Sequence, residues 1–88
     1  MNQITKDFED RRRQLQASLN ELDKNLAELE ASIKTITDNK DRLDVGIIRN
    51  ILQPMYSSRD RMRASRKIIE SDISNLTSTI SSLNKSGI

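Results

Sequence analysis

The stretch that decides the fold is residues 15–36, LQASLNELDKNLAELEASIKTI. Its apolar residues, from Leu15 to Ile36, follow one another at alternating steps of four and three residues. This spacing is typical of a coiled coil, in which positions a and d of each heptad abcdefg face a neighbouring helix. The flanking sequence is free of glycine and proline before Gly46. We therefore predict one long helix over about residues 5–43.

The second half of the chain carries the same repeat in a different phase. Its apolar residues from Ile69 to Leu83 again step by four and three. When this second frame is extended back to Val45, it differs by two residues from the first frame, which reaches Leu43. A stutter or a stammer shifts the frame of a continuous coiled coil by four or three residues, so neither explains this difference. We therefore predict a chain reversal between two helices. The a positions are Thr5, Arg12, Leu19, Leu26, Ile33 and Lys40, then Val45, Leu52, Arg59, Arg66, Ile73 and Ile80; the d positions are Phe8, Leu15, Leu22, Leu29, Ile36 and Leu43, then Ile48, Met55, Met62, Ile69, Leu76 and Leu83.

Two residues compete for the place of the reversal. Gly46 could adopt the left-handed conformation that ends many helices. Pro54 is costly inside a helix, and the following residues 57–60, SSRD, resemble a helix N-cap. Both alternatives stay open, so we expect a tip over about residues 44–56, with a short bent or separate helix, and a second helix over about residues 57–85.

Folding the chain back on itself gives an all-α, antiparallel helical hairpin that forms a single domain over residues 1–88. The a and d layers of the two helices match when paired residue numbers sum to 88, for example Phe8 with Ile80. The e positions then bring Asp23 and Glu30 near Arg63, which is an opposite-charge cluster.

The g positions of this hairpin are small and mostly uncharged. Small side chains allow a further helix to approach closely, whereas a solvated polar flank would look the same in sequence. Both interpretations stay open. The candidate partner-binding residues on this flank are Ser18, Asn25, Ser32, Ser58 and Ser65.

A second candidate partner-binding surface lies at the tip, in residues 45–56, VGIIRNILQPMY. This is the most apolar segment of the chain, and it carries more apolar residues than the a and d positions use. Ile47, Ile51, Met55 and Tyr56 are the candidates for an exposed interface. The alternative is that the segment folds back and caps the hairpin.

Basic residues cluster in residues 59–67 and 11–13. Residues 57–70 hold five basic and two acidic groups, but they face residues 16–36, which hold two basic and four acidic groups. The chain also has only two aromatic residues, too few for a base-stacking platform. A nucleic-acid-binding regulator is therefore the weaker alternative, and it resembles two-helix binders of the Rop kind in shape alone. Its candidate residues are Arg11, Arg12, Arg13, Arg59, Arg63, Arg66 and Lys67.

Composition argues against enzymatic chemistry. The 88 residues contain no His and no Cys, which removes the usual general base, the thiolate nucleophile and the common zinc ligands. No glycine-rich phosphate loop or metal-spacing motif is present. We therefore expect no catalytic, cofactor-binding or metal-binding residue, no cofactor and no small-molecule substrate.

The ends and the hydropathy bear on localisation. No apolar run reaches the roughly 18 residues of a membrane span, and the charged start MNQITKDFEDRRR is unlike a signal peptide. We expect a cytoplasmic protein, with signal-less export through a dedicated secretion system left open. Size and the mid-chain glycine are similar to those of secreted WXG100-type hairpins, but no Trp stands before Gly46, so that resemblance carries no function over.

Only 34% of the residues are hydrophobic, and most of them lie in the two heptad frames and the tip. A two-helix hairpin of this kind is marginally stable alone. We therefore expect a homo-oligomer, most simply a four-helix bundle of two hairpins, or a larger helical complex with another protein. The function predicted from sequence is a non-enzymatic protein–protein interaction module: a small coiled-coil adaptor, assembly factor or chaperone that binds partner helices.

Overall fold

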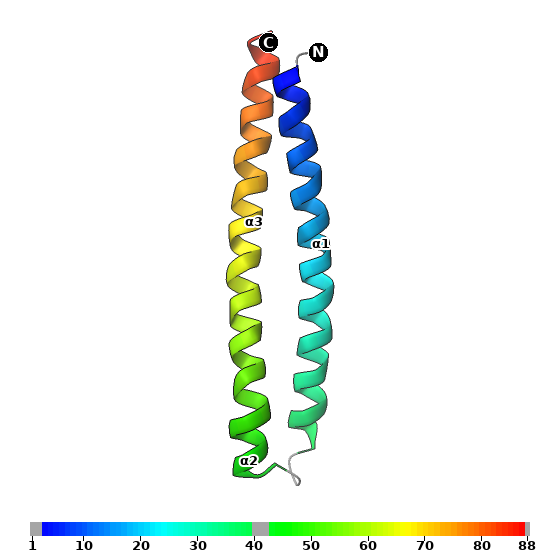
Figure 1. Ribbon diagram of the computed structural model, residues 1–88, viewed down its shortest axis with the longest axis vertical. Helices are drawn as coiled ribbons and strands as arrows, with labels where there is room; N and C mark the ends of the chain where they lie inside the picture. The colour runs from blue at the N-terminus through cyan, green and yellow to red at the C-terminus, as the bar shows by residue number, and fades with distance from the viewer. Residues whose placement is uncertain (1–2, 40–42, 88) are drawn as a thin grey trace.

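The computed structural model describes residues 3–39 and 43–87 and contains two long helical arms packed antiparallel (Figure 1). The first arm is helix α1 (Gln3–Asp38). The second arm consists of helix α2 (Val45–Ile47), the π-helix η2 (Ile48–Leu52) and helix α3 (Gln53–Lys85), which follow one another without a break. The molecule is a rod of 64 × 15 × 15 Å with both termini at one end. The predicted all-α helical hairpin is confirmed.

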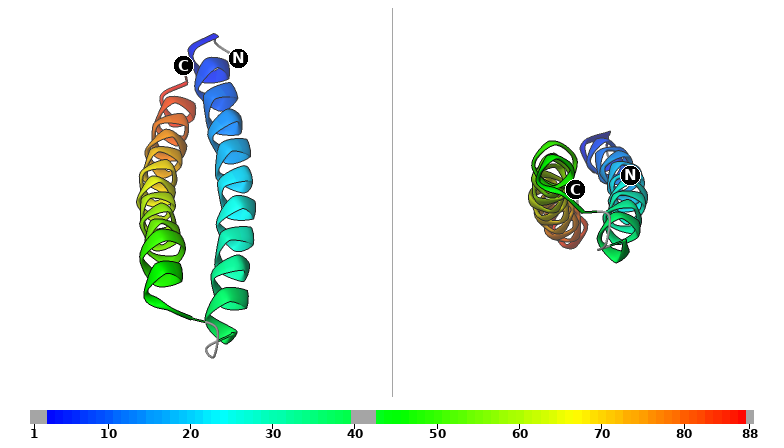
Figure 2. Two further views of the ribbon diagram at one scale, coloured as in Figure 1. Left: turned by 60° about the horizontal axis from the view of Figure 1, so that its bottom comes forward. Right: turned by 90° about the horizontal axis from the view of Figure 1, so that it is seen from below.

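The reversal lies between Asp38 and Val45, at the end of the rod opposite the termini (Figure 2). The predicted first helix extended to about residue 43, whereas α1 ends at Asp38 and Leu43 is not helical. Lys40, one of the predicted a positions, lies outside the described residues. Asp44 is the N-cap of the second arm, because its extended backbone allows its Oδ1 to accept a hydrogen bond of 2.8 Å from the Ile47 N–H.

Gly46 does not end a helix, so the first of the two turn interpretations is wrong. It is the second residue of α2, and the only positive φ of the described residues belongs to Gly87, at 73° just beyond α3. The physical reason is that Asp44 starts the second arm and leaves Gly46 inside its first turn. Left-handed glycine does end a helix here, but it is Gly87 at the far end of the chain.

Pro54 does not interrupt the second arm either. A proline in a helix lacks the N–H and clashes with the carbonyl four residues earlier. Here the π-helical turn η2 directly precedes it, and the Gln53 N–H donates to the Ile48 carbonyl, five residues back. The wider turn accommodates the proline ring, so the segment 57–60 lies inside α3 instead of capping a new helix.

The π-helical turn also shifts the heptad phase by one residue upstream of Leu52. The predicted frame placed Val45 and Ile48 between the arms, but their side chains are 67% and 41% exposed. Ile47 is half-buried instead, because one extra residue per turn brings it above Leu52. A heptad frame assigned from sequence assumes a regular α-helix, so it does not include that extra residue.

Burial between the arms is uneven in a systematic way. The buried apolar side chains of the described residues are Leu19, Ile33, Leu52 and Ile80, and the buried polar one is Thr5. All five occupy a positions, although two further apolar a residues, Leu26 and Ile73, are only half-buried. The d positions of α1 and α3 are half-buried without exception: Phe8, Leu15, Leu22, Leu29 and Ile36 in α1, and Met55, Met62, Ile69, Leu76 and Leu83 in α3.

Candidate protein-interaction surface

One side of the rod carries the e positions of both arms, which we call the e flank: Glu9, Gln16, Asp23 and Glu30 on α1, and Tyr56, Arg63, Glu70 and Thr77 on α3. Two ion pairs cross between the arms there. Arg63 Nη2 lies 2.9 Å from Glu30 Oε1, and Arg66 Nε lies 2.6 Å from Asp23 Oδ1. The predicted pairing of Glu30 with Arg63 is therefore found, whereas Asp23 is paired by Arg66 from an a position.

The arginines at a positions do not stay between the arms. The stems of Arg12 and Arg66 cover apolar surface while their guanidinium groups reach polar partners on the e flank. Arg12 Nη1 is 3.4 Å from Thr77 Oγ1, and Arg66 also pairs with Glu70 at 2.6 Å. The pKa of Arg66 is raised above its ordinary value, chiefly by the hydrogen bond to Asp23 and then by the charges of Asp23 and Glu70.

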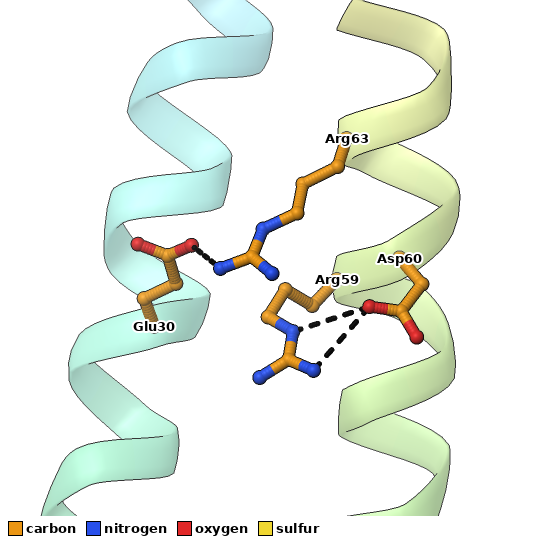
Figure 3. A network of polar contacts seen from close by, with 4 residues as sticks. All are labelled: Glu30, Arg59, Asp60 and Arg63. Atoms are coloured by element: carbon orange, nitrogen blue, oxygen red, sulfur yellow. Dashed lines mark hydrogen bonds and ion pairs between the residues drawn. The ribbon is translucent and has the colours of Figure 1, made fainter.

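A denser polar cluster lies nearer the tip than the termini, where Figure 3 shows Arg59 and Arg63 of α3 side by side. Arg63 reaches across to Glu30, while Arg59 turns back to Asp60 of its own helix at 3.3 Å. The Arg59 guanidinium also lies over the Tyr56 ring, 4.9 Å from its centre, which is a cation–π contact. The charges of this side are thus largely matched within one chain.

The opposite side carries the g positions, and we call it the g flank: Ile4, Arg11, Ser18, Asn25 and Ser32 on α1, and Ser58, Ser65, Asp72 and Thr79 on α3. Of these, only Ser58 is half-buried and the others are exposed. The Ser32 hydroxyl donates to the Glu28 carbonyl of its own helix at 3.1 Å. No ion pair among the described residues crosses between the arms on this flank.

The difference between the flanks explains the uneven burial. Around a helix of 3.6 residues per turn, position e lies beside a, and position g lies beside d. Long side chains at e cover the a residues, whereas serine and asparagine at g are too short to cover the d residues. The d residues therefore form a half-exposed apolar stripe along the g flank, and this stripe is the candidate interaction surface.

Exposed isoleucines extend this surface. Ile68 is 63% exposed at a c position beside the g flank, and Ile51 is 45% exposed at a g position. Sequence reasoning identified Ile51 but missed Ile68. The sequence signal for Ile68 was the doublet Ile68–Ile69, because only Ile69 occupies a d position between the arms.

Of the four tip residues predicted to bind a partner, two lie together and two lie elsewhere. Ile47 and Ile51 line an apolar depression of about 220 Å³ together with Ile36, Asn39 and Leu43. Ile47 is half-buried there, so the segment does fold back in part. Met55 and Tyr56 lie further along the second arm, where both are half-buried and Tyr56 is covered by Arg59.

The predicted nucleic-acid-binding residues do not form one patch. Arg12 contacts Thr77 near the termini, whereas Arg63 contacts Glu30 nearer the tip. Arg12 and Glu30 are 18 positions apart in α1, which separates the two clusters by about 27 Å at 1.5 Å per residue. The remaining basic candidates also differ in their surroundings. Arg13 pairs with Asp10 at 3.4 Å, whereas the side chains of Arg11 and Lys67 are exposed.

The described residues offer no grouping of three or more His, Cys, Asp or Glu side chains that could hold a metal ion. None of the helices, as far as they are described, is long and apolar enough to cross a membrane. Comparison of the chain with protein-family models, with curated proteins and with solved structures finds no match.

Proposed function

We propose that this protein is a non-enzymatic protein–protein interaction module that binds helical segments along its g flank. The observation that carries the proposal is the asymmetric burial of the heptad residues: the fully buried side chains all lie at a, whereas every described d position of α1 and α3 is only half-buried. Covering the d stripe would add to the apolar burial of the two-helix rod. A helix of another chain is the element that fits such a straight, narrow stripe.

The same geometry weighs against the nucleic-acid alternative. Arg63 and Arg66 are the basic residues best placed to form a patch, and both are paired with carboxylates of the same chain. Binding a phosphate backbone would require those pairs to break first. The two basic clusters are also too far apart to act as one short electrostatic surface.

The test compares two double variants, and each substituted residue of one variant is the sequence neighbour of a substituted residue of the other. Ser18→Arg with Ser65→Arg places two long charged side chains on the g flank, and Ala17→Arg with Ala64→Arg places them one residue away, on the outward f positions. Wild type and both variants are used to capture proteins from an extract of the native source. Each captured candidate is then purified and its binding to the hairpin is measured by calorimetry.

We expect a defined partner to bind wild type and the Ala17/Ala64 variant equally and the Ser18/Ser65 variant at least about tenfold more weakly, with all three equally helical by circular dichroism. Equal binding by both variants would contradict the proposal. A labelled RNA or DNA duplex provides the other arm of the test. Salt-dependent binding that is lost on Arg63→Glu with Arg66→Glu would favour the nucleic-acid regulator instead.

A further inference from the structure

The g flank has the dimensions of a protein–protein interface. The rod is 64 Å long and 15 Å wide, so one face has a projected area of roughly 960 Å². A standard specific interface buries about 800 Å² on each partner. Covering this one face would therefore bury an area of the size found in specific interfaces, and the charged e flank need not take part.

From this face we propose that the occupant is a second copy of the chain, with α1 of each copy packed against α3 of the other. The inference rests on the proposed function and names its partner. It gives a four-helix bundle whose two-fold axis runs along the rod, so that both tips lie at the same end. Every neighbouring pair of helices in this bundle is antiparallel.

Side-chain sizes on the g flank are complementary in this arrangement. In the register where residue numbers from the two copies sum to 87, each d residue faces a g residue. The facing pairs are Ser18 with Ile69, Leu22 with Ser65, Asn25 with Met62, Leu29 with Ser58 and Ser32 with Met55, the first of α1 and the second of α3 in the other copy. Each of these five pairs joins one large and one small side chain, which lets the layers interdigitate along the middle of the rods. Nearer the ends the same register pairs Arg11 with Leu76, Leu15 with Asp72 and Ile36 with Ile51.

This register also agrees with the hairpin itself. Within one chain the arms are matched where residue numbers sum to 88, so a sum of 87 between copies shifts them by a single residue, about 1.5 Å. The two rods therefore overlap along nearly their whole length. The apolar stripes end together, and neither copy leaves part of its stripe uncovered.

Charge decides between the two ways of stacking the rods. The c positions beside the g flank carry Glu21 and Glu28 on α1 and Arg61 on α3, and no ion pair of the described residues uses any of the three. Packing α1 on α3 of the other copy places Glu28 near Arg61. The alternative, with the tips at opposite ends, packs α1 on α1 and brings Glu28 against Glu21, which is repulsive.

The first measurement is the oligomeric state of the full chain by sedimentation equilibrium, with Ser18→Arg/Ser65→Arg and Ala17→Arg/Ala64→Arg as the matched pair. We expect a dimer for wild type and for the Ala17/Ala64 variant, and at least tenfold weaker dimerisation for the Ser18/Ser65 variant. A wild-type chain that stays a folded monomer at millimolar concentration would overturn the inference. Binding of another protein through the g flank would still stand, so the two failures are distinguishable.

The second measurement reads the sign of a charge change. Glu28→Lys should raise the dimer dissociation constant about three- to tenfold, because it places a second positive charge near Arg61, and Glu28→Lys with Arg61→Glu should restore it. If α1 packs on α1, Glu28→Lys tightens the dimer instead, because the new ammonium group meets Glu21. Tightening, or no change, would overturn the proposed packing.

The chain lacks cysteine, which makes disulfide mapping specific. Chains carrying Asn25→Cys and tagged chains carrying Met62→Cys are mixed and oxidised, with Ala17→Cys and Ala64→Cys as the outward-facing control pair. We expect a mixed disulfide between the Asn25→Cys and Met62→Cys chains and little cross-linking of the controls. A product formed mainly between two Asn25→Cys chains would overturn the α1-on-α3 packing.

Discussion

The e flank and the g flank run the same length of the same two helices, yet they treat the apolar residues beneath them differently. On the e flank, Glu30 and Asp23 of α1 are bridged to Arg63 and Arg66 of α3, and the a positions below include the most buried residues of the chain as described. On the g flank, serines leave the d residues half-exposed. Two helices can therefore cover their apolar residues more fully on one side than on the other, according to the length of the flanking side chains.

The largest effect should come from shortening an a residue. Ile33 is 8% exposed, so Ile33→Ala should lower the free energy of unfolding by about 2–4 kcal/mol. Leu29→Ala at the neighbouring d position should cost less in dilute solution, about 1–2 kcal/mol, because part of that side chain already contacts water. Urea unfolding followed by circular dichroism at micromolar concentration measures both.

Protein concentration sharpens this first prediction. If the d stripe is covered on association, the cost of Leu29→Ala should grow as the concentration rises, whereas that of Ile33→Ala changes little. Two results would contradict the distinction between the flanks. One is an equal loss of unfolding free energy for both variants at low concentration, and the other is a loss for Leu29→Ala that does not change with concentration.

An intermediate effect of opposite sign is expected at Thr5. Its side chain is 2% exposed, and its Oγ1 has no hydrogen-bond partner among the described residues. A buried hydroxyl without a partner is destabilising, so Thr5→Val should raise the free energy of unfolding by about 1 kcal/mol. Thr79→Val, an exposed g position on α3, is the comparison and should change the stability of the monomer in dilute solution by less than about 0.5 kcal/mol. A destabilised Thr5→Val variant would show that the a layer is open to water at this end.

The smallest effects should come from the charged residues. Glu30→Gln removes the partner of Arg63, and because both side chains are about half-exposed the loss should stay below about 1 kcal/mol and vanish in 1 M salt. Glu28→Gln, which removes no ion pair, should leave the monomer unchanged under the same conditions. Thermal melts at low and high salt make the comparison. A salt-independent loss for Glu30→Gln would mean that the pair acts through packing and not through charge.

Much of this fold could be predicted from the heptad repeat, and the failures are concentrated at the tip. The steps from Leu15 to Ile36 and from Ile69 to Leu83 correctly indicated two antiparallel helices. At the tip, Gly46 and Pro54 were both interpreted as helix breaks and both lie in helical turns. The propensity of a single residue is a weak signal there, because an N-cap at Asp44 and one π-helical turn satisfy the backbone in another way.

The residue types of the candidate interaction surface could be predicted from sequence, but the exposure of its apolar residues could not. The small g positions Ser18, Asn25 and Ser65 could be identified from sequence, with a solvated flank as an equal alternative. The half-exposure of the d residues could not, because the two arms can rotate about their own axes by a small angle without changing the heptad pattern. Ile68, in contrast, could have been placed beside the g positions from the heptad frame, because it is the c residue directly before Ile69.

The sequence by itself determined that this chain is a narrow helical hairpin with one polar and ion-paired side, because heptad spacing and charge placement act locally along each helix. Only the tertiary structure decided where the chain reverses, how the π-helical turn shifts the tip, and which heptad position is buried. Those features depend on how two helices settle against each other, and the balance between covering a and covering d is set by side chains that are far apart in sequence.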